Sequence, residues 1–494
     1  MPFCLRKTVL ALALGLIPGW AGAQPLPTQI QQFEQNPQHL DFLNKAIPPF
    51  SLDLHERLIV LPRYRDGSLY VEGGQGRQLH GVPSQVGVIA RISRQGRLEW
   101  QTRLPNIAMT EPVVTPNRVI VGLGGNRMFF HNVGYGCYSP FLHGWVGLSR
   151  KTGHIKWTYR THCQDMPTPF LAGNLVIGPT GGGRIIAVNA QTGKLVWQLP
   201  DGGWSAMSSP AVVGNIFYVG INGIHSSDNR MYAINWQTHT VKWSTPIPAA
   251  QNLSEPSPVV GEGLVFTAYM ARAQVDVRKI PDQNTFPDWD FQAEAFNAQT
   301  GKPVWTQYLY TEYAQRPRGF WKNLTEFGKI FGKGLLGTLE QTFPQDGINQ
   351  YLVGNAPAKK HPGIHNPPLT YWKGLVFVEP RTSDRLYALD ARSGQIRWSA
   401  ATQPTIANPA IHHGLLYTVS MHGRLTVYKA HSGKLVLTKQ LPLAGVGPTE
   451  VLLDKTGFIV GDMQGHFRSF TYPRRLDSAG SSRLLRNPGV ARKG

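Results

Sequence analysis

The stretch that decides the fold is LYALDARSGQIRW, residues 386–398. A short β-prone run ends at Asp390, a Ser-Gly turn follows, and a second short run ends in Trp398. This order predicts a β-hairpin. Gly394 can take a positive φ without steric cost, and the short side chain of Asp390 can bond the backbone of the turn.

The same pattern recurs in register along the chain. The other copies are VIARISRQGRLEW (88–100), WVGLSRKTGHIKW (145–157), IIAVNAQTGKLVW (185–197), MYAINWQTHTVKW (231–243), AEAFNAQTGKPVW (293–305) and LTVYKAHSGKLVL (425–437). The turn glycine is replaced once, by His239, and the final tryptophan once, by Leu437. A repeat of about 40 residues or more, with four strands per unit, is typical of a β-propeller.

The sequence after the seventh hairpin supplies part of one more blade. Residues 449–453, 457–460 and 466–470 have the pattern of three strands without an outer one. Strands begin near residues 54–61, and an N-terminal strand would complete this last blade and close the ring. We therefore expect an all-β propeller over residues 50–472, with eight blades, or seven as the alternative.

The ends of the chain lie outside the repeats. Residues 1–23 have the pattern of a secretory signal peptide, with Arg6 and Lys7 before an apolar run that is too short to span a bilayer. We expect residues 24–49 to form an arm on the propeller and residues 473–494 a flexible basic tail. The protein is thus predicted to be exported, to the periplasm or the outer surface or beyond, without an integral membrane segment.

Cys137 and Cys163 are the cysteines that remain after removal of such a signal peptide. In an oxidising compartment we expect them to form a disulfide that stabilises the fold by about 3–4 kcal/mol, with two free thiols as the alternative. The sequence shows no spacing of ligands typical of a metal site.

The charge is strongly basic, with 49 Lys and Arg against 29 Asp and Glu and a net charge of +20. Such a charge suits nucleic acid, an anionic surface, or a small anionic substrate in an acidic medium. The sequence has no nucleic-acid-binding motif, so we expect no nucleic-acid partner. Because few carboxylates are present, few native carboxylate pairs are lost when acid protonates them, and an acidic working environment fits the composition.

Three irregular insertions interrupt the repeat, at residues 124–144, 270–290 and 308–366. Connections between strands 2 and 3 of a blade, and those between blades, emerge on one face, so we expect the insertions to form a cap over one mouth of the central channel. The longest insertion has apolar residues at helical spacing between 320 and 339, which its glycines weaken. This partly helical element is expected to pack on its own propeller, on a second subunit or on a membrane.

Polar residues precede the inner strands and should surround the channel mouth. Each can simply cap the end of a strand, but together they would make a polar funnel under the cap, which is a common place for a ligand. These residues are Thr110, Glu111, Thr168, Ser208, Ser209, Ser254, Glu255, His365, Asn366, Asn408, Thr449 and Glu450.

Asp346 is the candidate catalytic residue, in the segment FPQDG of the longest insertion. It is either a turn aspartate before glycine or a general acid/base above the funnel. At pH ~3–4 a histidine is fixed as a cation, whereas an aspartate with a pKa of ~3.9 still exchanges protons. Basic side chains nearby would attract an anion, or are ordinary solvated charges; the substrate-binding candidates are Arg381, Lys360, His365, Asn366, Asn408 and Glu255.

The repeated hairpin, with its NAQTGKLVW-like core, resembles the tryptophan motif of quinoprotein-type (PQQ-like) propellers over about residues 50–472. Quinone-dependent dehydrogenases of this fold typically carry adjacent cysteines and a calcium site. This chain has no adjacent cysteines, so we expect no cofactor and no metal.

Within that group, the basic, exported chain with its long insertion resembles the tetrathionate hydrolases of acidophilic sulfur-oxidising bacteria. The resemblance implies an acid-active homodimer that splits tetrathionate, a small anionic sulfur compound, with water into thiosulfate, sulfur and sulfate by means of an aspartate. It assigns that role to Asp346 and the dimer contact to the 308–366 insertion. The alternative is a non-catalytic envelope propeller that serves as a scaffold for other proteins.

Overall fold

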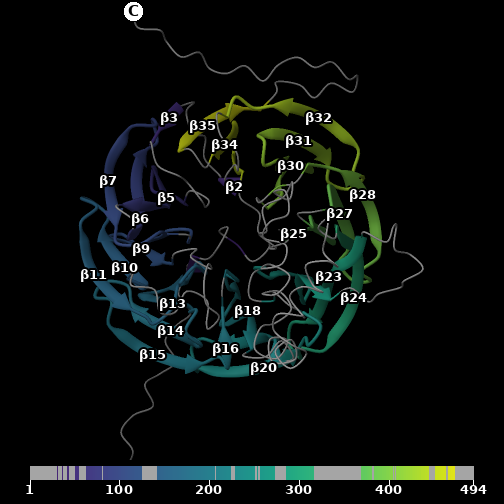
Figure 1. Ribbon diagram of the computed structural model, residues 1–494, viewed down its shortest axis with the longest axis horizontal. Coiled ribbons are helices and arrows are strands. Elements are labelled where there is room, and N and C mark those ends of the chain that lie inside the picture. Colours follow the sequence, from purple (N-terminus) through teal and green to yellow (C-terminus); the bar gives the residue numbers. More distant parts are fainter. Residues whose placement is uncertain are drawn as a thin grey trace, which may run out of the picture.

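Eight sheets stand in a ring around a central axis in the computed structural model (Figure 1). This confirms the all-β propeller and its count of eight blades rather than seven. The structure describes residues 30–31, 36, 42–43, 51–54, 63–79, 82–108, 110–124, 142–205, 207–223, 228–250, 253, 256–272, 285–315, 369–380, 383–403, 405, 408–443, 451–462 and 465–472.

Blades 1 to 7 are each built from four consecutive antiparallel strands, whose order in the chain runs from the axis outward. Blade 1 consists of β4 (Arg63–Arg65), β5 (Ser68–Leu79), β6 (Val82–Ser93) and β7 (Leu98–Leu104), and blade 2 of β8 (Val113–Val114), β9 (Arg118–Leu123), β10 (Gly144–Ser149) and β11 (Ile155–Arg160). Blade 3 consists of β12 (Phe170–Ala172), β13 (Leu175–Pro179), β14 (Arg184–Asn189) and β15 (Leu195–Pro200). Blade 4 consists of β17 (Ala211–Val213), β18 (Ile216–Gly223), β19 (Arg230–Asn235) and β20 (Thr240–Pro246). A short extra strand, β16 (Gly203–Trp204), pairs with β18. Blade 5 consists of β21 (Val259–Gly261), β22 (Leu264–Arg272), β23 (Thr285–Asn297) and β24 (Pro303–Gln315). Blade 6 consists of β25 (Leu369–Trp372), β26 (Leu375–Val378), β27 (Arg385–Asp390) and β28 (Ile396–Ala401). Blade 7 consists of β29 (Ala410–His412), β30 (Leu415–Val419), β31 (Arg424–Lys429) and β32 (Leu435–Gln440).

Blade 8 closes the ring with strands from both ends of the chain. Its inner strands are β33 (Leu452–Asp454), β34 (Gly457–Gly461) and β35 (His466–Thr471), and its outer strand is β3 (Ser51–Asp53), which pairs antiparallel with β35. The predicted N-terminal strand therefore completes the last blade, although it lies just before residues 54–61 rather than within them.

Two further pieces of the N-terminal arm lie at the inner edges of blades. β1 (Ile30–Gln31) pairs with β12, and β2 (Phe42–Leu43) runs parallel to β33. Both strands are thus added on the side of the blade that faces the axis. The arm was expected on the propeller, and its described parts lie inside the ring.

All seven predicted hairpins form strands 3 and 4 of a blade, and each has a β-bulge next to the final tryptophan or leucine. In blade 6, Ala388 is opposite Trp398 while Leu389 is opposite Ile396, so one residue is unpaired. The turn is held by Asp390, whose Oδ1 accepts hydrogen bonds from the backbone N–H of Arg392 (3.1 Å) and Ser393 (2.9 Å). This confirms the role predicted for that aspartate.

The tryptophans of blades 1, 2, 4, 5 and 6 join each of these blades to the next one. The indole N–H of Trp305, in blade 5, donates to the carbonyl of Ala391 in blade 6 at 2.9 Å. A Cβ added to the turn glycine of blade 6, Gly394, would lie 2.6 Å from the Trp305 ring. The glycine is therefore needed for its contact with the indole as well as for its φ of +73°. Equivalent bonds to the next blade are made by Trp100, Trp157, Trp243 and Trp398.

The joint between blades 3 and 4 has a tryptophan but no such bond among the described residues. There His239 replaces the turn glycine, with φ of +57°, and its ring packs against Trp197 at a centroid distance of 4.5 Å and an angle of 30°. Within the described residues, the buried indole N–H of Trp197 has no hydrogen-bond acceptor.

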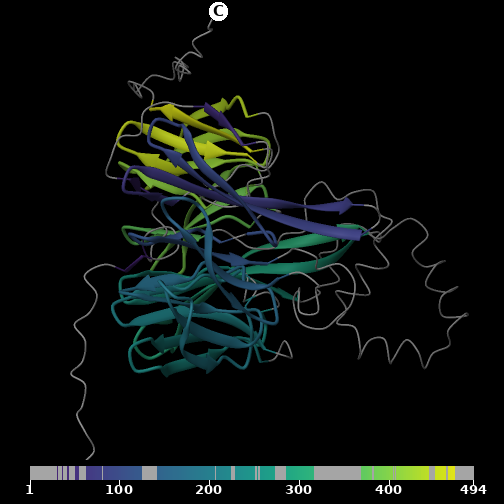
Figure 2. The same cartoon turned by 90° about the vertical axis from the view of Figure 1, so that its left-hand side faces the viewer.

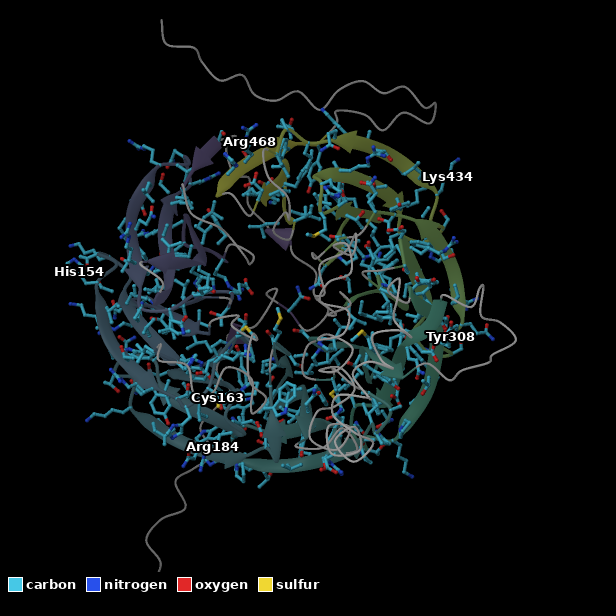
Figure 3. All side chains as sticks on the ribbon, in the orientation of Figure 1. His154, Cys163, Arg184, Tyr308, Lys434 and Arg468 are labelled. Carbon is cyan, nitrogen blue, oxygen red and sulfur yellow. The ribbon has the colours of Figure 1, made fainter. Side chains whose placement is uncertain are left out.

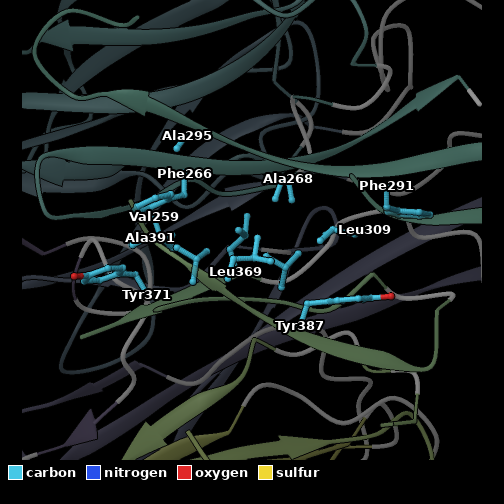
Figure 4. Packing of buried hydrophobic residues seen from close by; sticks show 14 of the residues in the cluster. Val259, Phe266, Ala268, Phe291, Ala295, Leu309, Leu369, Tyr371, Tyr387 and Ala391 are labelled. Carbon is cyan, nitrogen blue, oxygen red and sulfur yellow. The ribbon is translucent and has the colours of Figure 1, made fainter. Parts of the chain in front are cut away.

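The core consists of apolar layers between neighbouring blades. The layer between blades 5 and 6 contains Phe266, Phe291, Leu369 and Tyr387, all buried (Figure 4). The rings of Phe266 and Tyr371 stack across this layer at 5.9 Å and 7°. In the described part of the ring, the blades thus bury their faces against their neighbours.

Two long hairpins, β5–β6 and β23–β24, project from the same face of the ring (Figure 2). We call this the arm face. Pairing of Thr285 with Gln315 and of Ala271 with Asp290 shows that the chain leaves the blade at Arg272 and at Gln315 on that face. The departure points of two predicted insertions thus lie on the same side. The insertions are shorter than expected, because residues 270–272, 285–290 and 308–315 extend the strands; the predicted helical part, residues 320–339, lies outside the described residues.

Candidate functional site

Polar side chains at the heads of the inner strands link successive blades on the arm face. The backbone N–H of Glu111 donates to Thr168 Oγ1 (2.8 Å), that of Thr168 to Ser209 Oγ (2.9 Å), and that of Ser209 to Ser257 Oγ (3.0 Å). These side chains are buried. The sequence left two roles open for these polar residues: capping the ends of strands or binding a ligand. The hydrogen bonds show that the described residues among them cap strand ends.

Asn408 belongs to the same group. Its Oδ1 accepts a hydrogen bond from the backbone N–H of Leu369, in the preceding blade, at 3.1 Å. The side chain is half-buried. Its oxygen therefore holds two blades together, and a role for it in substrate binding stays a prediction.

The other predicted site residues are not placed together by the structure, because they lie outside the described residues. They are Asp346, Arg381, Lys360, His365, Asn366 and Glu255, with Ser254, Thr449 and Glu450 of the funnel. Cys163 is described, is buried and is disulfide-bonded (Figure 3). Its predicted partner, Cys137, lies outside the described residues, so that pairing stays a prediction.

The described residues show a buried ionic group between blades 1 and 2 that the sequence analysis did not identify. Arg63 and Glu111 form an ion pair of 2.7 Å, with side chains only 3% and 1% exposed. Glu72, on β5, is fully buried near Thr110 and Glu111. Burial raises the pKa of Glu72 well above its usual value, Thr110 lowers it in part, and the charge of Glu111 raises it further. Although Thr110 is a neighbour, neither Glu72 oxygen makes a hydrogen bond of normal geometry within the described part of the chain.

A second buried acid, Asp165, lies where the chain passes from blade 2 to blade 3, two residues after Cys163. Its Oδ2 accepts a short hydrogen bond from Thr161 Oγ1. Burial raises the pKa of Asp165 to about 8, and the hydrogen bonds from Thr161 and the Gly181 backbone lower it only in part. The neighbouring Gln164 is also buried, and both its polar atoms lack partners among the described residues.

Burial also raises the pKa values of two further acids, Asp201 and Glu294. Asp201 lies in the connection from blade 3 to blade 4, and burial raises its pKa to about 6 against the hydrogen bond from Gly203 N–H. Burial also raises the pKa of Glu294, whose Oε2 accepts the Tyr269 hydroxyl at 2.9 Å. These carboxyl groups have no ion pair among the described residues, so each is most easily buried as a neutral acid. Acid removes the cost of burying them.

Two kinds of site are absent from the described residues. No helix there is long and apolar enough to cross a membrane. No three His, Cys, Asp or Glu side chains there are grouped closely enough to hold a metal ion.

Comparisons with known proteins agree with this architecture. The family model "Outer membrane protein assembly factor BamB" matches residues 66–200, 143–284 and 289–469. Among solved structures, BamB from Moraxella catarrhalis superposes with a TM-score of 0.52 at 12% identity, covering 86% of this chain and 97% of that one. Quinohemoprotein alcohol dehydrogenase from Comamonas testosteroni gives a TM-score of 0.52 at 14% identity, with 91% and 81% covered. At these identities the structural likeness concerns the fold alone.

Two curated proteins are similar in sequence. Tetrathionate hydrolase of Acidithiobacillus ferrooxidans is 26% identical over 354 residues, covering 66% of this chain. The match spans 65% of that enzyme's length. BamB of Yersinia pestis is 26% identical over 347 residues, covering 65% of this chain and 79% of BamB. Taken with the eight blades and their tryptophan joints, the family match shows that the chain belongs to the BamB-type family of PQQ-like repeat propellers.

Proposed function

We propose that this protein is an exported, acid-active hydrolase that cleaves tetrathionate. The observation that carries the proposal is the 26% identity to tetrathionate hydrolase over 354 residues. The very basic composition, with a net charge of +20, fits a dianionic substrate. The buried carboxyl groups, whose pKa values burial raises, fit work in acid, where they are neutral.

The reaction needs one water per substrate. Tetrathionate and water give thiosulfate, sulfur and sulfate, and two protons are released, so a group must accept a proton from the attacking water. We assign this role to Asp346, because a carboxyl with a pKa of ~3.9 exchanges protons at pH ~3–4. Arg381 and Lys360 would hold the sulfonate ends, with Glu255, His365, Asn366 and Asn408 lining the funnel beneath.

The fold supports a common location for these groups. Two of the three insertions leave the propeller on the arm face, at Arg272 and Gln315. The insertion that carries Asp346 starts on this face, at the end of the outer strand β24, and we propose that it reaches over the channel mouth. We further propose that the rest of the 308–366 insertion contacts a second copy of the chain, as its apolar residues would be covered there.

The test is turnover of tetrathionate by the purified protein at pH ~3–4, near the usual pKa of aspartate, followed as thiosulfate release. Asp346→Asn should lower kcat by about 10²–10⁴-fold, the usual contribution of a general acid/base. Asp282→Asn, which removes a carboxylate from a different insertion, is the matched control and should keep its activity. No turnover at any acidic pH would refute the proposal, whereas full activity of Asp346→Asn would refute only the assignment of that residue.

The second candidate is a non-catalytic scaffold in the cell envelope. The family match and the 26% identity to BamB of Yersinia pestis favour it equally well at the level of the fold. In that case the long hairpins of the arm face would contact a protein partner. Shortening the β23–β24 hairpin should then abolish capture of an envelope partner by the purified chain, while tetrathionate would remain uncleaved.

A further inference from the structure

The face opposite the arms carries a repeated pair of an exposed lysine and an exposed aliphatic residue. The turn between β23 and β24, residues 298–302, lies at the end of the hairpin away from the arm tips, and the same turn of each other blade lies on that side. We call this the turn face. Immediately after these turns the outer strands begin with the pairs Ile155–Lys156, Lys194–Leu195, Val241–Lys242, Lys302 with Val304, and Lys434–Leu435. We call these five pairs, from blades 2, 3, 4, 5 and 7, the lysine–aliphatic ring.

The aliphatic members are unusually exposed for their type. Ile155 is 42% exposed, Val241 48% and Leu435 54%. They belong to the outer strands β11, β20 and β32. Figure 3 labels two of their sequence neighbours, His154 and Lys434, at the rim of the propeller. These exposed side chains lie within three residues of the turns, so they add apolar area at the rim of the turn face in five of the eight blades.

The charge of this face is one-sided. The lysines of the ring are exposed and form no ion pair among the described residues. The carboxylates near them are already neutralised: Asp66 lies 3.0 Å from Arg150, Glu262 2.7 Å from Arg392, and Asp390 2.7 Å from Arg397. Among the described residues, the turn face therefore carries more positive charge than its paired acids neutralise.

We propose that the lysine–aliphatic ring docks the turn face onto an anionic phospholipid surface. Lysines next to exposed aliphatic residues are typical of proteins that lie at a membrane interface, where the cation meets headgroup phosphate and the apolar side chain enters the region below it. A circle of such pairs at one level suits a flat, extended partner better than a small ligand. The proposal concerns the face opposite the candidate site and does not depend on the proposed activity.

Edge protection is the competing explanation. Lysines on outer strands prevent sheets from pairing edge to edge, and the outer strand of each blade is such an edge. That explanation accounts for the cations but not for the aliphatic residue beside each one, which makes an unprotected edge more adhesive. The two explanations also differ in what happens when the charge is removed.

The test is co-sedimentation of the full chain with vesicles of phosphatidylglycerol and phosphatidylcholine in equal parts, and with vesicles of phosphatidylcholine alone. The triple variant Lys156→Gln, Lys242→Gln, Lys302→Gln should bind the anionic vesicles about 100-fold more weakly, because each basic residue near such a surface contributes about fivefold. The matched control is Arg103→Gln, Arg160→Gln, Arg184→Gln. These exposed arginines lie at the arm-face ends of β7, β11 and β14, and their loss should leave binding unchanged.

Two further measurements separate the contributions. Binding of the unaltered protein should weaken steeply between about 0.05 M and about 0.5 M salt, since the screening length falls severalfold. Ile155→Ser with Leu435→Ser should weaken binding by an amount that salt does not change.

The proposal is wrong if the unaltered protein fails to bind the anionic vesicles, or if both triple variants lose binding equally. It is also wrong if the lysine variant self-associates while its vesicle binding is intact, which would favour edge protection. Equal binding to soluble polyphosphate but not to vesicles would assign the ring to soluble polyanions instead.

Discussion

Replacing Gly394 by alanine tests the physical basis of the blade joints. Gly394 has φ of +73°, and a Cβ there would lie 2.6 Å from the Trp305 ring. Gly263 provides a matched control, because its φ is +75° and an added Cβ would meet nothing within 4 Å. Both variants place alanine in the left-handed region, but only one displaces an indole.

The expected costs follow from these contacts. Gly263→Ala should lower the free energy of unfolding by about 1–2 kcal/mol, the cost of a left-handed L-residue. Gly394→Ala should lower it by about 2–4 kcal/mol more, because it also overpacks the joint and pulls the Trp305 N–H from the Ala391 carbonyl, 2.9 Å away. Urea unfolding should show the difference as a lower midpoint at an unchanged slope.

A double variant sharpens this test. Leu437 stands naturally at the position of the tryptophan in blade 7, so Trp305→Leu is a replacement that the fold tolerates in another blade. In that background Gly394→Ala should cost little more than the control substitution, giving a coupling energy of about 1–3 kcal/mol. Equal midpoints for Gly394→Ala and Gly263→Ala, or additive effects of Gly394→Ala and Trp305→Leu, would refute the docking argument.

Other predictions concern the buried charges and the disulfide. Because the pKa of Asp165 is raised to about 8, its contribution to stability is fully present below pH ~4 and is lost as the pH rises through 8. Asp165→Asn should therefore flatten the fall in stability over that range, measured as urea midpoints at several pH values. Burial lowers the pKa of His143, so this residue makes the free energy of unfolding rise with pH below pH ~6.5. A stability that rises with pH over the range where Asp165 should make it fall would contradict the Asp165 argument. Arg63→Met should cost about 3–5 kcal/mol, because Glu111 is left buried without its cation; a double variant that also carries Glu111→Gln should recover part of this. Cys163→Ser should cost about 3–4 kcal/mol and make the unfolding midpoint insensitive to reducing agent, unlike that of the unaltered protein.

The sequence predicted the blades well because their turns are governed by local chemistry. In the turns that contain an aspartate or asparagine, its side chain bonds the backbone ahead of a positive-φ residue. The tryptophan that follows contacts the turn of the next blade. These contacts involve only one hairpin and its neighbour. Asn189 and Asp390 accept the same backbone hydrogen bonds in different blades, so the pattern can be recognised without any knowledge of the rest of the chain. The closing strand was found for a similar reason, since the last blade lacks its outer strand in the C-terminal part of the sequence.

The candidate site was less predictable, because its groups depend on contacts that sequence spacing does not record. Glu72 illustrates this. It follows an apolar run on β5, at the position where Gly122 and Gly220 stand in blades 2 and 4. A Cβ added to Gly122 would lie 2.2 Å from the backbone oxygen of Asp165, and one added to Gly220 would lie 2.2 Å from that of Leu253. Both oxygens belong to the connection that leads to the next blade. Comparing the blades in register would have marked Glu72 as a large acid in a place built for glycine.

The inner placement of β1 and β2 could not be predicted for a different reason. Each pairs over only two residues with a strand more than a hundred residues away, and neither has an alternating pattern of its own. Such short additions are held by the edge they join, not by their own sequence.

These differences follow from the topology of the propeller. Turns between strands 3 and 4 all lie on one face, where the repeat keeps them short, and connections between strands 2 and 3 and between blades lie on the other, where length is free to vary. The turn face therefore repeats its residues, and any function it has must be distributed around a circle, as the lysine–aliphatic ring is. The connections of the arm face vary from blade to blade, which is why we place the proposed reaction, with its single aspartate, on that face. The proposed activity and the proposed surface attachment therefore lie on opposite sides of the ring, and a substitution that removes one should leave the other unchanged.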